Sequence, residues 1–197
     1  MAGTRRGRLR RPHRQPVRRI LVVTEGTRTE PQYVEGLNRY LRSKGTTAIV
    51  KPVPVGKDPL KTVQKCVEKR DEAERKDKGY DDCVCLVDVD EHQTLSAAIQ
   101  LAERENILLL ISNLKFETWL RWHAEDKRSA LSSTQLDDLV GKLGLVKGKV
   151  LSQSFPFDRV HEASGIARAV DPEMRPGLKG PNPSSAMPIL VDLMQGN

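Results

Sequence analysis

Aromatic residues and cysteines are scarce in this chain, and long apolar runs are missing. Aromatic residues make up 4% of the 197 residues, which argues against a base-stacking surface for single-stranded nucleic acid. Three cysteines, an odd number, argue against a disulfide framework and favour a reducing cytoplasm. The sequence shows neither a run long enough to cross a bilayer nor a signal-peptide core, so we expect a cytoplasmic protein without a membrane partner.

Positive charge is abundant and unevenly placed. The formal net charge of +7 suggests a polyanionic partner such as nucleic acid. Arginines crowd the first residues, Arg5, Arg6 and Arg8 among them, with almost nothing apolar between them. We interpret residues 1–16 as a basic disordered arm that could contact phosphates non-specifically. A solvated tail that only aids solubility explains the same residues equally well.

Short apolar runs alternate with segments of helical periodicity. Continuous apolar runs at 20–23, 83–87 and 107–111 are typical of strands that are buried on both faces. A weaker strand begins at residue 48, where Pro52 and Pro54 favour an edge position. This alternation predicts an α/β fold, Rossmann-like, with a mostly parallel sheet flanked by helices. The expected helices lie at about 31–45 with Thr27 or Thr29 as N-cap, at 59–78 with Asp58 as N-cap, at 95–102 and at 116–123.

The pattern changes after about residue 129. Helices are expected around 136–143 and 162–170, and a last helix runs through Met194 with Ser184 or Ser185 as its cap. We expect a helical appendage at about 129–195 on an α/β core at about 18–125. Together they would form a single domain, residues 17–197.

Acidic side chains stand at the ends of the expected strands. Asp88 and Asp90 follow one strand, Glu25 follows another, and Asn113 ends a third. Because right-handed crossovers bring the carboxyl ends of parallel strands to one edge, these side chains should converge, and Glu117 can reach the same rim. A carboxylate cluster there destabilises the fold unless a cation neutralises it. The simplest interpretation is a site for Mg²⁺ or Mn²⁺, which prefer oxygen ligands.

Three functions are compatible with such a rim. Phosphodiester hydrolysis needs a metal that polarises the phosphate and activates water, which makes a nuclease the first hypothesis. A phosphatase-like enzyme could use Asp88 as a nucleophile, although the place of the Asp-x-Asp pair on the third strand counts against it. A non-catalytic nucleic-acid- or partner-binding module would keep the rim for metal-assisted structure.

The chain also carries four short blocks in a fixed order: VTEGTRTEPQY at 23–33, LVDVDEH at 86–92, SNLKFETWL at 112–120, and NPSS at 182–185 before an apolar helix. Together they resemble the RloB-like family, which is associated with abortive phage infection. The resemblance spans about residues 18–195. It implies a Toprim-like fold, Mg²⁺-dependent cleavage of nucleic-acid phosphodiesters, and a role in anti-phage defence with a possible defence-system partner protein.

The resemblance also assigns roles to individual residues. It implies that Glu25, Asp88 and Asp90 are catalytic and bind the metal, with Glu30 and Glu117 as further metal ligands. Acidic residues also favour the first turn of a helix, so Glu30 and Glu117 have a purely helical explanation too. The expected substrate-binding residues are His92, Asn113, Lys115, Arg5, Arg6 and Arg8. A structural role is an alternative for His92. The choice between DNA and RNA and the oligomeric state stay open.

Overall fold

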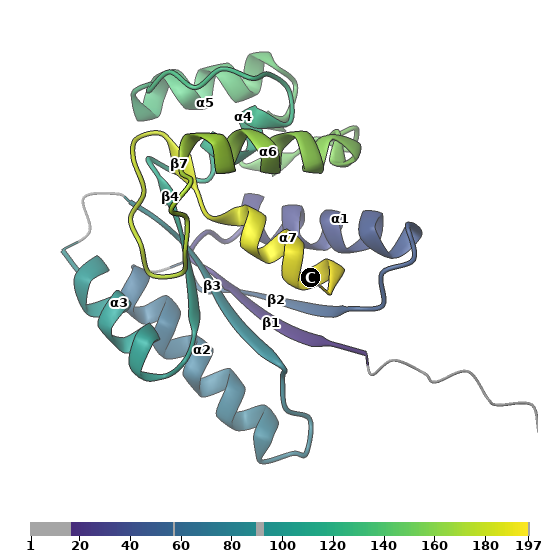
Figure 1. The fold of residues 1–197 in the computed structure, drawn as a ribbon, viewed down its shortest axis with the longest axis vertical. Coiled ribbons are helices and arrows are strands. Elements are labelled where there is room, and N and C mark those ends of the chain that lie inside the picture. The colour runs from purple at the N-terminus through teal and green to yellow at the C-terminus, as the bar shows by residue number, and fades with distance from the viewer. Residues whose placement is uncertain (1–16, 57, 90–92, 197) are drawn as a thin grey trace, which may run out of the picture.

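The computed structural model describes residues 17–56, 58–89 and 93–196, so the predicted basic arm lies outside the described residues. The described chain forms a mostly parallel sheet with helices on both faces, consistent with a Rossmann-like fold (Figure 1). The predicted α/β class is confirmed. None of the described helices is both long and apolar enough to span a bilayer.

Five strands form the main sheet in the order β2-β1-β3-β4-β7. The parallel strands are β1 (Arg19–Thr24), β2 (Ile49–Pro54), β3 (Asp82–Asp88) and β4 (Leu108–Asn113). The last strand, β7 (Ser184–Ser185), pairs antiparallel with β4. Because β1 and β3 are neighbours at the centre of the sheet, the residues that follow them meet at the same edge.

The edge position predicted for β2 is confirmed, and its prolines lie on the outer side. The N–H groups of Ile49 and Val55 both donate toward the β1 segment, at 2.8 and 3.0 Å. Alternate residues point the other way, so Pro52 and Pro54 occupy positions where an N–H would have no strand to pair with. The prolines therefore cost the sheet no hydrogen bond, and they remove two donors from an exposed edge.

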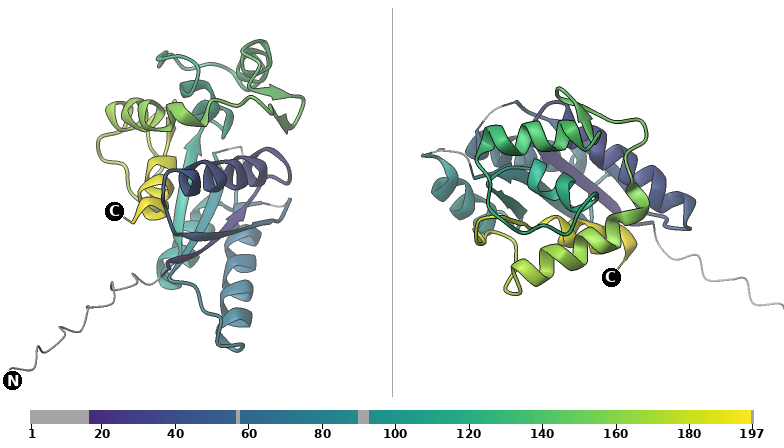
Figure 2. Two further views of the ribbon diagram at one scale, coloured as in Figure 1. Left: turned by 90° about the vertical axis from the view of Figure 1, so that its right-hand side faces the viewer. Right: turned by 90° about the horizontal axis from the view of Figure 1, so that it is seen from above.

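Helical layers cover the two faces of the sheet (Figures 1 and 2). One face packs against α2 (Pro59–Glu74) and α3 (Leu95–Arg104). The other packs against α1 (Thr29–Ser43), α4 (Glu117–Trp122), α6 (Val160–Val170) and α7 (Met187–Gln195). Side chains of the central strands alternate between the two cores: Leu21 and Val23 belong to the first, Ile20 and Val22 to the second. This explains why these strands are continuously apolar in the sequence.

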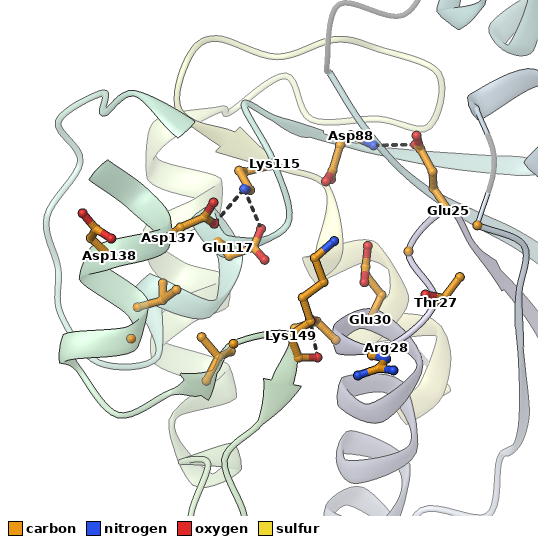
Figure 3. A pocket seen from close by; sticks show the side chains of 17 residues that line it. Glu25, Thr27, Arg28, Glu30, Asp88, Lys115, Glu117, Asp137, Asp138 and Lys149 are labelled. Atoms are coloured by element: carbon orange, nitrogen blue, oxygen red, sulfur yellow. Dashed lines mark hydrogen bonds and ion pairs between the residues drawn. The ribbon is translucent and has the colours of Figure 1, made fainter. Parts of the chain in front are cut away.

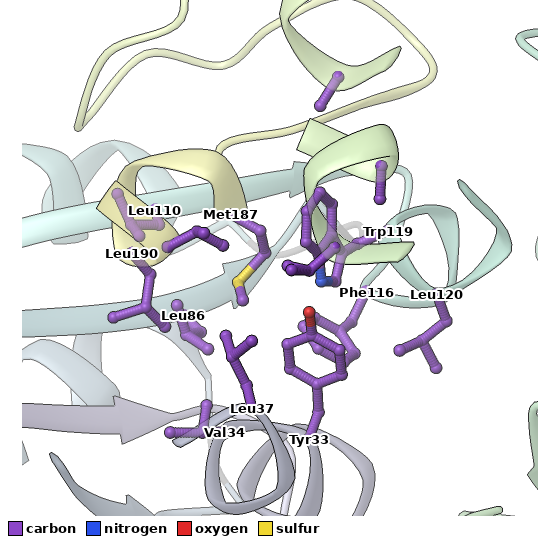
Figure 4. Packing of buried hydrophobic residues seen from close by; sticks show 14 of the residues in the cluster. Tyr33, Val34, Leu37, Leu86, Leu110, Phe116, Trp119, Leu120, Met187 and Leu190 are labelled. Carbon is purple, nitrogen blue, oxygen red and sulfur yellow. The ribbon is translucent and has the colours of Figure 1, made fainter. Parts of the chain in front are cut away.

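The larger core is built around aromatic side chains from α1 and α4. Tyr33 packs edge to face against Phe116 and Trp119, with ring centroids 5.5 and 6.2 Å apart (Figure 4). Trp119 and Trp122 are fully buried, as expected for core residues. Met187 and Leu190 of α7 close this core from the C-terminal side.

The C-terminal part contains α5 (Ser133–Lys142), α6 and α7 as predicted, together with strands that the sequence pattern did not predict. A hairpin of β5 (Val146–Lys147) and β6 (Val150–Leu151) follows α5, and a short 3₁₀ helix, η1 (Phe157–Arg159), precedes α6. The prediction that Ser184 or Ser185 caps the last helix is wrong, because α7 begins only at Met187. Both serines pair with β4, and the Ser185 hydroxyl lies 2.9 Å from that of Ser112.

Of the three predicted helix caps, one is confirmed. Asp58 caps α2, where its side chain accepts from the Lys61 N–H at 3.2 Å. In α1 the N-cap position is held by Arg28, without a side-chain cap, so the expected threonine cap is wrong. Thr29 instead donates its hydroxyl to the carbonyl of Lys149, 3.1 Å away, which ties the start of α1 to the hairpin.

Candidate functional site

A cavity of about 790 Å³ lies beyond the carboxyl ends of β1 and β3 (Figure 3). The start of α1 bounds it on one side, and α5 and the β5–β6 hairpin bound it on the others. The structure brings four predicted acidic residues to this cavity, although they come from distant parts of the chain. These four residues, called the acidic rim below, are Glu25, Glu30, Asp88 and Glu117.

Asp88 stands at the centre of the acidic rim, as the last residue of β3. Its backbone N–H donates to Oε2 of Glu25 at 3.2 Å, which turns that carboxylate toward the end of β3. Burial raises the pKa of Asp88 well above its ordinary value, and the negative charges of Glu30, Glu117 and Glu25 raise it further. A hydrogen bond from the Phe116 backbone offsets part of this rise. The raised pKa of Asp88 thus reflects burial together with repulsion from its neighbouring carboxylates.

Glu30 lies in the first turn of α1, with its carboxylate directly over Gly26. A Cβ atom at position 26 would overlap both carboxylate oxygens of Glu30. Burial raises the pKa of Glu30, and hydrogen bonds from the backbone of Glu30 and Gly26 counteract this. Gly26 is not among the glycines with positive φ, so backbone freedom is not what this position needs. What the site requires at this position is space.

Glu117 and Lys115 connect the acidic rim to α5. The Lys115 ammonium donates to Oδ1 of Asp137 at 2.7 Å and lies 3.9 Å from Oε2 of Glu117. Burial raises the pKa of Glu117, and the charge of Lys115 opposes the rise. Lys115, which was predicted to bind substrate, lines the cavity. Its ammonium is already paired with the carboxylates of Asp137 and Glu117.

Asn113, another predicted substrate-binding residue, does not line the cavity. Asn113 is buried, and its amide donates to the carbonyl of Gly180 at 3.0 Å, which holds the segment before β7 against the sheet. Asp90 and His92 lie outside the described residues, as do the three arginines of the arm. Their assigned roles stay predictions.

Several residues that line the cavity had not been assigned individual roles from the sequence. Asp137 and Asp138 of α5, Arg28 before α1, and Lys149 of the hairpin all line it. No strand-end signal marks them, because α5 and the hairpin reach the cavity only through tertiary packing. Lys149 follows Gly148, which has a φ of +62° in the hairpin turn, and this Lys-Gly-Lys turn is the sequence signal that was available.

The donor set suits a hard divalent cation. Among the described residues, six carboxylates and three basic side chains line the cavity, so this part of it is locally acidic although the whole chain carries +7. Carboxylate oxygens are the ligands that Mg²⁺ and Mn²⁺ prefer. Within residues 17–56, 58–89 and 93–196, no three His, Cys, Asp or Glu side chains are arranged as a ready metal-binding group. Side-chain rotation would be needed for these carboxylates to share an ion.

Comparison with known proteins gives one result. The model of a family described as RloB-like protein matches residues 20–194, which include every residue of the acidic rim. Searches of curated proteins and of solved structures found no match. Because the matched segment covers most of the chain, the protein belongs to the RloB-like family.

Proposed function

We propose that this protein is a metal-dependent nuclease of the Toprim type that cleaves nucleic-acid phosphodiesters in defence against phage. The observation that carries the proposal is the convergence of the acidic rim on one open cavity at the ends of two adjacent parallel strands. A Glu after the first strand and an Asp after a later one is also the arrangement that the family resemblance implies for a Toprim-like fold.

Asp88 and Glu25 are the residues best placed to hold Mg²⁺ or Mn²⁺, since one backbone hydrogen bond already joins them. Glu30 and Glu117 would complete the oxygen donor set, with water in the remaining positions. When bound, the ion would polarise the phosphate and lower the pKa of an attacking water. It would also neutralise the repulsion that raises the pKa of Asp88.

The open part of the cavity beside the acidic rim would receive the sugar-phosphate backbone. The residues that line it include no aromatic side chain, so the described part of the cavity offers no platform for base stacking. Recognition would instead use phosphate charge, which is largely independent of sequence. The basic residues of the arm would add non-specific affinity for the same backbone.

The test is cleavage of mixed DNA and RNA substrates by the full chain with Mg²⁺, with Mn²⁺ or with EDTA. Asp88→Asn is compared with Asp138→Asn, which changes a carboxylate on the α5 wall of the same cavity. We expect metal-dependent cutting that Asp88→Asn abolishes and Asp138→Asn retains, with both variants folded by circular dichroism. Nucleic-acid binding that is intact and indifferent to metal, without cutting, would replace the nuclease with the binding-module alternative.

A further inference from the structure

The β5–β6 hairpin extends a lysine over the acidic rim. Its two strands pair through Val146 with Leu151 and through Lys147 with Val150. The turn between them is Gly148-Lys149, and the left-handed backbone of Gly148, with a φ of +62°, directs Lys149 back toward the cavity. Lys147 lies on the same hairpin but does not line the cavity.

The hairpin is fixed to the part of α1 that carries Glu30. The Thr29 hydroxyl donates to the Lys149 carbonyl at 3.1 Å, and the Leu151 N–H donates to Oε1 of Gln32 at 2.8 Å. Since Thr29 and Gln32 flank Glu30 in the first turn of α1, the backbone of Lys149 keeps a set position relative to the acidic rim.

The side chain of Lys149 reaches into the cavity between Glu30 and Glu117 (Figure 3). Its charge is near enough to oppose the burial that raises the pKa of both carboxyl groups. Within the described chain, however, Lys149 forms no ion pair within 4.0 Å, whereas Lys115 is paired with Asp137 at 2.7 Å. Its ammonium is therefore available to a ligand in the cavity.

We propose that Lys149 binds the non-bridging oxygens of the phosphate to be cleaved and holds it against the acidic rim. The inference rests on the proposed nuclease function. Four carboxylates repel a phosphodiester unless positive charge lies close to it. A rim-bound cation would supply part of this positive charge, and the ammonium of Lys149 would supply the rest.

Two further features agree with this placement. A lysine is a compact charge on a flexible stem, so it can follow the phosphate as negative charge develops on its oxygens. The α5 wall opposite carries Asp138, whose charge disfavours a phosphate path on that side. The substrate backbone would therefore run along the wall formed by Arg28 and Lys149. Lys149 forms no covalent bond in this scheme and loses no proton.

The test compares Lys149→Ala, Lys149→Arg and the control Lys147→Ala in the full chain with Mg²⁺. Loss of a donor that stabilises developing charge lowers kcat by about 10²–10³-fold, and we expect this for Lys149→Ala together with a higher KM, because the same ammonium holds the phosphate before the reaction. Lys149→Arg should recover part of the activity, and Lys147→Ala should behave as wild type. Equal losses in both alanine variants, or none, would overturn the inference.

A binding measurement separates failure of this inference from failure of the proposed function. Pyrophosphate is titrated calorimetrically into the wild type and both alanine variants in the presence of Mg²⁺. If the wild type cuts no substrate, weaker pyrophosphate binding in Lys149→Ala alone still identifies Lys149 as a phosphate ligand. Equal binding by all three proteins, or none by the wild type, would remove Lys149 from phosphate recognition.

Discussion

The stability of this protein should fall in mildly acidic solution because of His123, which follows α4 and is fully buried. Its Nδ1 lies 3.1 Å from the Trp119 carbonyl, so Nδ1 carries the hydrogen of the neutral ring. Its Nε2 lies 3.1 Å from the Tyr33 hydroxyl and accepts from it. Protonation would direct a second N–H at the Tyr33 oxygen and would place a charge among aromatic rings.

The size of the effect follows from the pKa of His123 in the two states. Burial lowers this pKa to about 4 from an ordinary value of 6.5. The unfolded chain therefore binds the proton more tightly, and the free energy of unfolding falls as the pH falls between these values. At about 1.4 kcal/mol per pKa unit, the full cost is about 3 kcal/mol, of which about 2 kcal/mol is reached near pH 5. Above the ordinary pKa the cost vanishes.

Urea unfolding of wild type and His123→Gln at about pH 7.5 and about pH 5 measures this contribution. The stability advantage of wild type over the variant should shrink by about 2 kcal/mol at the lower pH. Because wild type and His123→Gln have the same carboxylates, the difference between their free energies of unfolding cancels the titration of those carboxylates. The control is His161→Gln, which removes an exposed histidine and should keep the pH dependence of wild-type stability. A difference that does not change with pH, or an NMR titration of His123 near its ordinary pKa, would refute the reasoning.

Three further predictions concern the acidic rim and the arm. Gly26→Ala should displace the Glu30 carboxylate and reduce cleavage at least about tenfold. The free energy of unfolding should change by less than about 1 kcal/mol, because the flexible Glu30 side chain can move. Gly165→Ala, in open space on α6, is the control, and unchanged cleavage in Gly26→Ala would show that Glu30 serves only the helix. Asp88→Asn in EDTA should raise the melting temperature by a few degrees or leave it unchanged, because repulsion falls, and a loss of several degrees would make Asp88 a structural acceptor instead. Deleting residues 1–16 should weaken nucleic-acid binding and flatten its salt dependence; an unchanged slope would exclude the arm.

Strand-end positions were predictable from the sequence because the central strands are buried on both faces. Such strands leave continuous apolar runs, and the residue after each run is then fixed at one edge of a parallel sheet. The strand ends alone bring Glu25 and Asp88 together, although 63 residues separate them. No knowledge of side-chain contacts is needed.

The remaining parts of the site depend on tertiary contacts that leave little trace in the local pattern. Strand β7 is only two residues long, and both of its residues are serines, which a sequence pattern assigns equally well to a helix cap. Likewise, Lys115 meets Asp137 only because α5 docks beside the acidic rim. The place of Lys149 follows from contacts of the hairpin with α1, 120 residues earlier in the chain.

Metal binding by the acidic rim is the central claim, and titration of Mn²⁺ into the full chain, followed by electron paramagnetic resonance, tests it most directly. We expect a Mn²⁺ site in the wild type that Asp88→Asn loses and Asp138→Asn retains. Mn²⁺ bound equally by wild type and Asp88→Asn, or by neither, would contradict this claim.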